Sequence, residues 1–376
     1  MAGTRWALFL LLSATSVGIP QQSSVPAPAD SAPNPQATDQ DHPALSHRPS
    51  PSPAQGQIKL DVLVTDAAGR PVAGLQQGDF SLLDDKKPQP ILFFRAADGS
   101  IGQGAAEPPV EVILLIDATN NSIRNVAFER DQIAKFLRQN GGRLAQPLTL
   151  MIFSERGVQV GPRPSTDGSL VAQELDKSGA TMHTVQRSGG YDAIERVELS
   201  LKTLRSIVAV EAPKPGRKML IWIGPGWPML ENPGYRASDA TQRALFNAIV
   251  ETTRTLREAR ITVYNVNQLD PSSTAFAGFY KGFLNGVPSP RQAESGDLSL
   301  PVFAIHSGGL VLNTPGDLVS QLNRCVTEAK AYYTLGFDPL KADHTDEYHE
   351  LEVKISKPGM KVRTNAGYYG EPAFRP

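Results

Sequence analysis

The sequence predicts an α/β protein in which a doubly wound, mostly parallel sheet is inserted in a small β-sandwich built from both ends of the chain. The first observation is the apolar run Val112–Ile116, which fits a strand covered on both faces. The second is the alternation of apolar runs with amphipathic helical patterns up to about residue 329, as in a parallel sheet. The third is the alternation of apolar and polar residues, with a period of two, in the segments near both ends of the chain, as in β-strands with one buried face.

The length of the chain, 376 residues, leaves room for two domains and terminal tails. The 37 basic and 38 acidic residues are balanced and form no basic block, which argues against a nucleic-acid partner. Cys325 is the only cysteine, so an internal disulfide framework and a cysteine-based zinc cluster are excluded. Its place on the inner face of an expected helix indicates a buried core thiol.

The N-terminal segment is typical of an exported protein. Residues 1–18 combine Arg5, the apolar run Trp6–Leu12 and small residues, which predicts a signal peptide, with an uncleaved anchor as the alternative. The run is far shorter than the ~20 residues of a membrane span, so we expect no transmembrane segment in the mature chain. Residues 19–56 are rich in Pro, Ser and Ala, which predicts a disordered tether. We therefore expect a secreted, periplasmic or cell-envelope protein.

Residues 57–107 are predicted to form the N-terminal part of the β-sandwich. A half-buried strand is indicated by alternating apolar residues at Ile58, Leu60, Val62 and Val64. Turn residues separate it from further strand patterns at Val72–Leu75, Phe80–Asp85 and Ile91–Phe94.

Residues 108–329 are predicted to form the inserted α/β domain. Beside Val112–Ile116, the expected strands are Leu148–Phe153, an edge strand Val158–Val160, Met219–Ile223, Ile261–Val266 and Gly308–Asn313. The expected helices begin after Asn121, with an inward stripe at Ile123, Val126, Ile133 and Leu137, and continue at Asp167–Lys177, Ile194–Leu204, Ser238–Ala259 and 314–329. Thr314 is expected to cap the last helix, with Pro315 in its first position. Residues 271–298 are expected to be an inserted loop.

Residues 330–370 return to a period of two and are predicted to form the C-terminal part of the β-sandwich. The expected strands are Tyr332–Phe337, Tyr348–Ile355 and Met360–Thr364. Neither end of the chain has enough strands for a secure core of its own. We therefore expect the two ends to pair into one sandwich.

Asp117 occupies the position where a ligand is most expected. In open α/β sheets ligands gather beyond the carboxyl ends of the strands, and Asp117, Thr119 and Asn121 directly follow the central apolar strand. Trp227 follows a later buried strand, either as a recognition aromatic on the same rim or packed down as a lid. Tyr191 is a further candidate for this surface.

Several short stretches occur in a specific order: Val62–Val72, Gly74–Phe80, Ile113–Asp117, Gly189–Ile194, Ser307–Gly309, Tyr332–Phe337 and Val362–Tyr368. With them the chain from Ile58 to Tyr368 resembles the von Willebrand factor A-type domain and, more narrowly, the secreted VWFA-related family common in Acidobacteria. The resemblance implies a von Willebrand A-like fold for the inserted domain and a binding function of the adhesion type.

The resemblance also implies a metal-ion-dependent adhesion site, in which an Asp-x-Ser-x-Ser segment and residues of two other loops surround a divalent cation. Asp117 matches the first position, Thr119 supplies a hydroxyl, and Asn121 offers a neutral carbonyl oxygen. Hard oxygen ligands of this kind suit Mg²⁺ or Ca²⁺.

The other two loops depart from that pattern. The threonine of the second loop is replaced by Ser188-Gly-Gly, which leaves Thr184 or Ser188 as substitutes, and Gly224–Gly226 stands where an acid is expected. We therefore expect a degenerate site at Asp117, Thr119 and Asn121, with weak or no Mg²⁺ or Ca²⁺ binding and no other cofactor. Asp117 is then expected to cap the following helix and order its loop.

The sequence gives little support to an enzyme. It contains no nucleophile elbow, phosphate loop, dinucleotide fingerprint or zinc-protease motif. His344 and His349 fall among acidic residues in a polar stretch, which predicts a solvated hairpin loop, with a surface cation as the alternative.

Two functions follow from these observations. The first is a secreted, non-enzymatic binding module that recognises a protein or other extracellular macromolecule at the rim formed by Asp117, Thr119, Asn121, Tyr191 and Trp227. The alternative is a structural or assembly component of the cell envelope, in which this site is inert and the β-sandwich makes the contacts.

Overall fold

The computed structural model describes residues 56–97, 107–178, 190–229, 238–268, 278–314 and 316–372. The expected signal peptide over 1–18 and all of the expected tether over 19–56 except Gly56 lie outside these residues, as do Thr184 and Ser188. None of the described helices combines the length and the apolar character that a membrane crossing needs.

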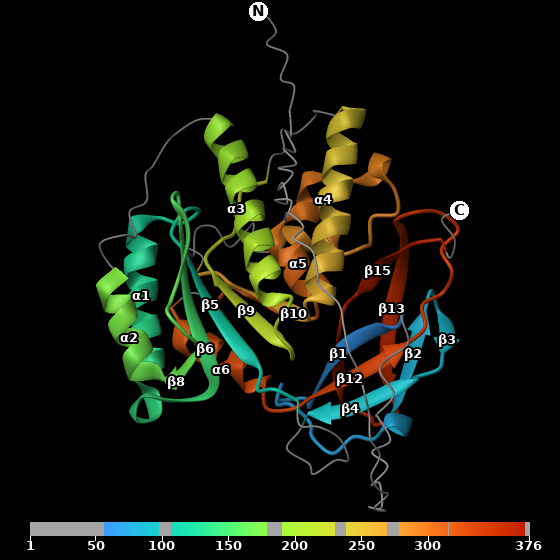
Figure 1. Cartoon of the computed structure of the whole chain (residues 1–376), viewed down its shortest axis with the longest axis horizontal. Helices are drawn as coiled ribbons and strands as arrows, with labels where there is room; N and C mark the ends of the chain where they lie inside the picture. Colours follow the sequence, from blue (N-terminus) through green and yellow to red (C-terminus); the bar gives the residue numbers. More distant parts are fainter. Residues whose placement is uncertain are drawn as a thin grey trace, which may run out of the picture. The chain divides into compact units, whose positions relative to one another are not determined.

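A seven-stranded sheet forms the centre of the α/β part (Figure 1). Its order is β11-β10-β9-β5-β6-β7, and β8 also pairs with β6. The first five strands of this order run parallel, whereas β7 and β8 run antiparallel to β6. The strands are β5 (Glu111–Asp117), β6 (Arg143–Ser154), β7 (Gly157–Val160), β8 (Ser165–Asp167), β9 (Lys218–Ile223), β10 (Ile261–Val266) and β11 (Val311–Leu312).

Helices cover both faces of this sheet, which explains the uninterrupted apolar run of β5. Val112, Leu114 and Ile116 belong to one core cluster, while Ile113 and Leu115 belong to another on the opposite face. The first cluster includes residues of α1 (Ile123–Leu137), α2 (Gly168–Lys177) and α6 (Leu318–Thr327). The second includes residues of α3 (Gly190–Glu211), α4 (Asp239–Glu258) and α5 (Leu300–His306). The prediction of an α/β protein with a mostly parallel sheet is confirmed.

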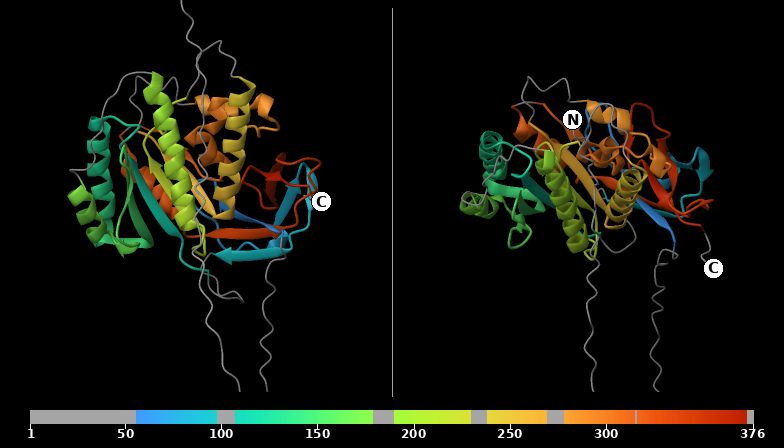
Figure 2. Two further views of the ribbon diagram at one scale, coloured as in Figure 1. Left: turned by 45° about the horizontal axis from the view of Figure 1, so that its top comes forward. Right: turned by 90° about the horizontal axis from the view of Figure 1, so that it is seen from above.

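Two four-stranded antiparallel sheets combine strands from both ends of the chain, with the orders β14-β1-β12-β4 and β15-β13-β2-β3 (Figure 2). In the first, Ile58 pairs with Phe337, and in the second Asp84 pairs with Leu351. One apolar core cluster joins the inner faces of both sheets, which is a sandwich arrangement. The strands are β1 (Ile58–Thr65), β2 (Phe80–Asp84), β3 (Lys87–Gln89), β4 (Phe93–Ala97), β12 (Tyr332–Phe337), β13 (Glu347–Ile355), β14 (Lys361–Arg363) and β15 (Gly367–Gly370).

Ion pairs with little exposure connect the sandwich strands to the α/β part. Arg260, just before β10, donates from Nε to Asp61 of β1 at 3.1 Å and also pairs with Glu107. Arg363 of β14 pairs with Glu328, whose side chain is 2% exposed. Because each partner would be costly to bury alone, these pairs favour one arrangement of the connected strands.

Several predicted elements differ from those in the structure. No strand forms at Val72–Leu75, and the preceding Pro71 makes only an isolated bridge with Thr65. The last helix begins at Leu318 with Asp317 as its N-cap, so Thr314 does not cap it. Ile123 was expected to face inward but is 60% exposed, because it lies in the first turn of α1, beyond the sheet core.

The sequence interpretation also missed α5 and three short strands, β3, β8 and β15. Of these, α5 packs in the second core cluster and β15 pairs with β13. The described part of the expected loop over 271–298 contains three short 3-10 turns, at Phe279–Phe283, Pro290–Gln292 and Ser295–Leu298. Two further 3-10 turns lie at Gln77–Asp79 and Gln139–Gly142.

Candidate ligand-binding site

Asp117 is the last residue of β5 and lies at the point where the sheet changes its winding direction. The chain passes from β5 to its neighbour β6 on one side, and later places β9 on the other side of β5. The connections leave on opposite faces of the sheet, because α1 packs on one face and α4 on the other. Such a switch point is the usual ligand position of an open α/β sheet. The structure therefore places Asp117 at the expected edge.

The carboxylate of Asp117 points into the protein and is surrounded by N–H donors. Its side chain is 0% exposed. Oδ1 accepts from the backbone N–H groups of Thr119 at 3.1 Å and Asn120 at 2.8 Å, and Oδ2 accepts from the side-chain amide of Asn120 at 2.9 Å and the indole of Trp222 at 2.9 Å. Burial raises the pKa of Asp117, while the hydrogen bonds from Asn120 and Trp222 oppose this rise.

The hydrogen bonds of Asp117 order the loop Ala118–Ser122 but do not cap the helix that follows. The N-cap of α1 is Ser122, whose Oγ accepts from the backbone N–H of Asn125 at 3.2 Å. Asn120 also donates to Oγ of the buried Ser200 on α3 at 3.0 Å. The expectation that Asp117 orders its loop fits this geometry, whereas the expected capping role falls to Ser122.

Asn121 is bound to Glu129, a residue that the sequence interpretation missed. The side-chain amide of Asn121 donates to both carboxyl oxygens of Glu129, at 2.9 and 3.0 Å, and its own Oδ1 accepts from the backbone N–H of Ser122. Burial raises the pKa of Glu129 to about 8; the hydrogen bond from Asn121 opposes this rise and nearby Asp117 adds to it. The signal in the sequence was its spacing, since Glu129 lies on the inward stripe between Val126 and Ile133.

Trp227 packs into the core and does not form part of an exposed rim. Its side chain is 6% exposed and its indole donates to the backbone carbonyl of Leu298 at 3.0 Å. Its ring meets those of Trp222 and Phe303, with centroids 5.7 and 6.4 Å away. The sequence left two alternatives open for Trp227. The structure contradicts an exposed recognition aromatic and agrees with a side chain that packs inward.

Gly224 and Gly226 allow the chain to turn closely over Asp117 and into the core. A Cβ at Gly224 would lie 2.8 Å from the Cβ of Asp117, and its φ of +134° is unfavourable for other residues. A Cβ at Gly226 would lie 2.8 Å from the Cβ of Leu300. The glycines that replace the expected third-loop acid thus have a packing role.

Thr119 and Tyr191 complete the set of predicted site residues. Thr119 Oγ1 is buried and has no hydrogen-bond partner among the described residues, and the same holds for Oδ1 of Asn120. Tyr191 lies in the first turn of α3, but its side chain is outside the described part of the structure. The structure therefore places Asp117, Thr119 and Asn121 at one loop and buries Trp227 in the core against Trp222 and Phe303.

Among the described residues, Thr119 Oγ1 and Asn120 Oδ1 have no partner, but the only carboxylate of residues 117–122, that of Asp117, is already engaged. Both oxygens of Asp117 and the Oδ1 of Asn121 already accept N–H groups. In the described part of the chain, no group of three His, Cys, Asp or Glu side chains with metal-ligand spacing gathers at Asp117. A cavity of about 170 Å³ opens instead near the amino end of β5, lined by residues that include Val112, Arg143 and Lys330.

Comparisons with known proteins give only remote likenesses. No family model and no curated protein matches the chain. The human COPII-coat protein Sec24c is 10% identical with a TM-score of 0.34, over 88% of this chain and 48% of that one. Proximal thread matrix protein 1 from the mussel byssus is 10% identical with a TM-score of 0.30, over 60% of this chain and 46% of that one. The chain spans about half the length of these structures, and at these scores they assign it no family or function.

Proposed function

We propose that this chain is an exported, non-enzymatic binding module with a von Willebrand A-like domain, which recognises a protein or other extracellular macromolecule beside Asp117. The observation that carries the proposal is the hydrogen-bonded loop Ala118–Ser122, which leads directly into the exposed Ile123. A loop already held by part-buried hydrogen bonds to Asp117 loses little conformational entropy on binding. An exposed apolar side chain next to it can serve as an anchor for a partner.

The proposed recognition does not depend on a cation bound at Asp117. Mg²⁺ requires a nearly octahedral shell of oxygen ligands, and here a cation would have to displace N–H donors from the carboxylate of Asp117. The adhesion site implied by the resemblance is therefore degenerate in this proposal. Contact with the partner is made by Ile123 and by the accessible atoms of the half-buried loop residues Thr119–Ser122.

A second candidate function is a structural or assembly component of the cell envelope that makes its contacts through the β-sandwich. The burial of two expected contact residues favours it, since Asp117 is 0% and Trp227 is 6% exposed. The sandwich also carries an exposed apolar residue of its own, Leu92, which is 50% exposed before β4. This residue provides a matched comparison for Ile123.

Site-specific photo-crosslinking in the cells that make the protein separates the two candidates. A photoreactive phenylalanine analogue replaces either Ile123 or Leu92 in the full chain, and both positions are exposed and apolar. Discrete adducts from position 123 that persist in the presence of a chelator support the proposed function. Adducts from position 92 alone favour the second candidate, and the absence of adducts from both positions contradicts both.

A further inference from the structure

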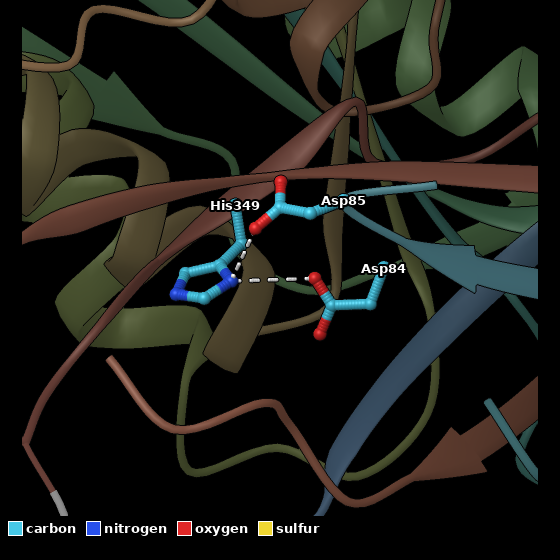
Figure 3. A group of neighbouring side chains, drawn as sticks. All are labelled: Asp84, Asp85 and His349. Atoms are coloured by element: carbon cyan, nitrogen blue, oxygen red, sulfur yellow. Dashed lines mark ion pairs between the residues drawn. The ribbon is translucent and has the colours of Figure 1, made fainter. Parts of the chain in front are cut away.

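A second group of polar side chains lies at one end of the sheet β15-β13-β2-β3 and is separate from the loop at Asp117. Asp84 is the last residue of β2, Asp85 begins the turn to β3, and His349 lies near the start of β13 (Figure 3). Asp84 is 0% and His349 3% exposed, whereas the side chain of Asp85 is 39% exposed. His349 was expected in a solvated hairpin loop. The structure instead places it on the inward face of β13, in line with Leu351 and Val353.

The two carboxylates point toward the same nitrogen of the imidazole ring. Nδ1 of His349 lies 3.4 Å from Oδ1 of Asp84 and 2.9 Å from Oδ2 of Asp85, as the dashed lines in Figure 3 mark. Despite these distances, neither ring nitrogen has a hydrogen-bond partner among the described residues, and Oδ1 of Asp84 has none either. Buried polar atoms are rarely left in this way, so these three atoms of His349 and Asp84 point to a further partner.

The remaining carboxylate oxygens are held in place by neighbouring donors. Oδ2 of Asp84 accepts from the hydroxyl of Tyr368 at 2.6 Å and from the backbone N–H of Leu340 at 3.1 Å. Oδ1 of Asp85 accepts from the backbone N–H of Glu350 at 2.9 Å. The ring of Tyr368 also stacks on that of His349, with centroids 4.8 Å apart. The two carboxylates are thus held by neighbouring donors, as is usual around metal ligands, and the imidazole is held by ring stacking.

Two of the three spacings between these atoms fit a common bound cation, and all three atoms lie within 4.8 Å of one another. A cation with ligands at about 2.0 to 2.1 Å holds them about 2.8 to 3.4 Å apart, for angles between a right angle and the tetrahedral angle. The two contacts of Nδ1, at 2.9 and 3.4 Å, have these lengths. In the described part of the chain no Lys or Arg forms an ion pair with Asp84 or Asp85, and their ion-pair partner is His349, which is charged only when protonated. A divalent cation would balance the two carboxylates beside a neutral imidazole.

We propose that Asp84, Asp85 and His349 form a binding site for a divalent transition metal of the zinc type. One imidazole nitrogen and two carboxylate oxygens suit Zn²⁺ better than Ca²⁺ or Mg²⁺, which prefer oxygen ligands alone. The partly exposed Asp85 leaves access for water as a further ligand. Because the ligands come from strands near opposite ends of the chain, the metal joins β2 to β13 and stabilises the sandwich.

The test titrates Zn²⁺ into chelator-treated full chain by calorimetry and compares Asp85→Asn with the wild type. Asparagine can still accept from Glu350 N–H and tolerates the φ of +48° at this position, so the variant retains the local fold. In this variant the position of Oδ2, which faces His349, is taken either by an amide NH₂ group, which cannot bind a metal ion, or by a neutral carbonyl oxygen, which binds it more weakly than a carboxylate. We expect Asp85→Asn to bind Zn²⁺ at least about tenfold more weakly than the wild type. Loss of a residue that only orients a metal ligand already weakens binding about tenfold or more, and loss of a ligand should cost more.

Two control variants remove nearby groups that are not in the cluster. Glu350→Gln removes an exposed acid beside His349, and His344→Gln removes an exposed histidine of the adjacent loop. Both are expected to bind Zn²⁺ like the wild type. At one fixed Zn²⁺ concentration, the rise in melting temperature is expected to be the same for the wild type and both controls and smaller for Asp85→Asn. Equal binding by Asp85→Asn and the wild type, or weakened binding by either control, overturns the assignment.

A measurement on the wild type alone keeps the proposal open to refutation if the Asp85 variant does not fold. Co²⁺ bound by one imidazole and two carboxylates gives visible d–d absorption bands, which a saturating amount of Zn²⁺ removes. We expect these bands at one equivalent of Co²⁺. Their absence, or the absence of Zn²⁺ binding by the wild type at micromolar concentration, overturns the site.

Discussion

The indole N–H of Trp222 donates to Oδ2 of Asp117 at 2.9 Å, and neither side chain has any exposed surface. Trp222 lies on β9, which pairs with β5, so the hydrogen bond joins two adjacent strands at the residue that precedes the loop Ala118–Ser122. The ring of Trp222 is in turn packed between Phe153 and Trp227. The position of the acid is therefore set by the aromatic core beneath it.

Replacing Trp222 with phenylalanine is expected to destabilise the protein more than the same change at Trp227. Trp222→Phe leaves a buried carboxyl oxygen with one donor fewer, at a cost of about 1–3 kcal/mol in addition to the lost volume. Trp227→Phe loses a hydrogen bond to a neutral backbone carbonyl, worth about 0.5–1.5 kcal/mol. Urea denaturation of both variants measures the difference. An equal or larger loss for Trp227→Phe would show that the bond to Asp117 adds little.

Much of the architecture could be predicted because it depends on patterns within short segments. The run Val112–Ile116 required cover on both faces, and the structure has a core cluster on each. The lack of strands at each end suggested that they pair, and β1 pairs with β12 in the structure. These inferences needed only apolar periodicity and the number of strands that a stable sheet needs.

The candidate site was harder to predict because its side chains are placed by distant partners. The direction of Trp227 depends on the carbonyl of Leu298 and on the turn at Gly226, which local sequence does not reveal. Glu129 and His349 each occupy an inward position of a regular pattern, but both are polar and were therefore read as exposed or ignored. Each of these polar residues occupies a position where the helix or strand period places apolar residues, and this position was the signal that it is buried.

Gly226 is expected to tolerate alanine poorly because of the close approach of α5. At φ +74° an added Cβ would lie 2.8 Å from Cβ and 2.9 Å from Cδ2 of Leu300. Gly74 has a similar φ of +78°, but a Cβ there meets nothing within 4 Å. Gly226→Ala should therefore cost about 1–3 kcal/mol more than Gly74→Ala, since only the former overpacks the core. Chemical denaturation of the two variants provides the comparison, and equal losses would point to backbone strain alone.

The single cysteine is expected to react only when the protein unfolds. Cys325 is 0% exposed on the inner face of α6, and burial raises the pKa of its thiol. Thiol reagents attack the thiolate, so both access and ionisation limit the reaction. We expect no modification by a maleimide under native conditions and one equivalent in concentrated urea. Rapid labelling of the native protein would mean that α6 opens readily from the sheet.

Glu129 is expected to make the stability of the protein fall as the pH rises. Its pKa is raised by burial from 4.5 to about 8 in the folded protein, so the folded state keeps a proton that the unfolded chain releases. The stabilising contribution is therefore complete below about pH 4.5 and is lost progressively up to about pH 8. Over that range one such group changes the free energy of unfolding by at most about 1.4 kcal/mol per pH unit.

Glu129→Gln tests this dependence because glutamine is neutral at every pH and can still accept from Asn121. Urea denaturation between pH 5 and pH 9 should show a flatter dependence of stability on pH for Glu129→Gln than for the wild type. Asp131→Asn is the matched control, since Asp131 is exposed on the same helix and its removal should leave the slope unchanged. If Glu129→Gln retains the slope of the wild type, the folded protein does not hold a proton on Glu129. Glu129 would then be an ionised buried acid near Asp117, and a bound cation there would become the simpler explanation.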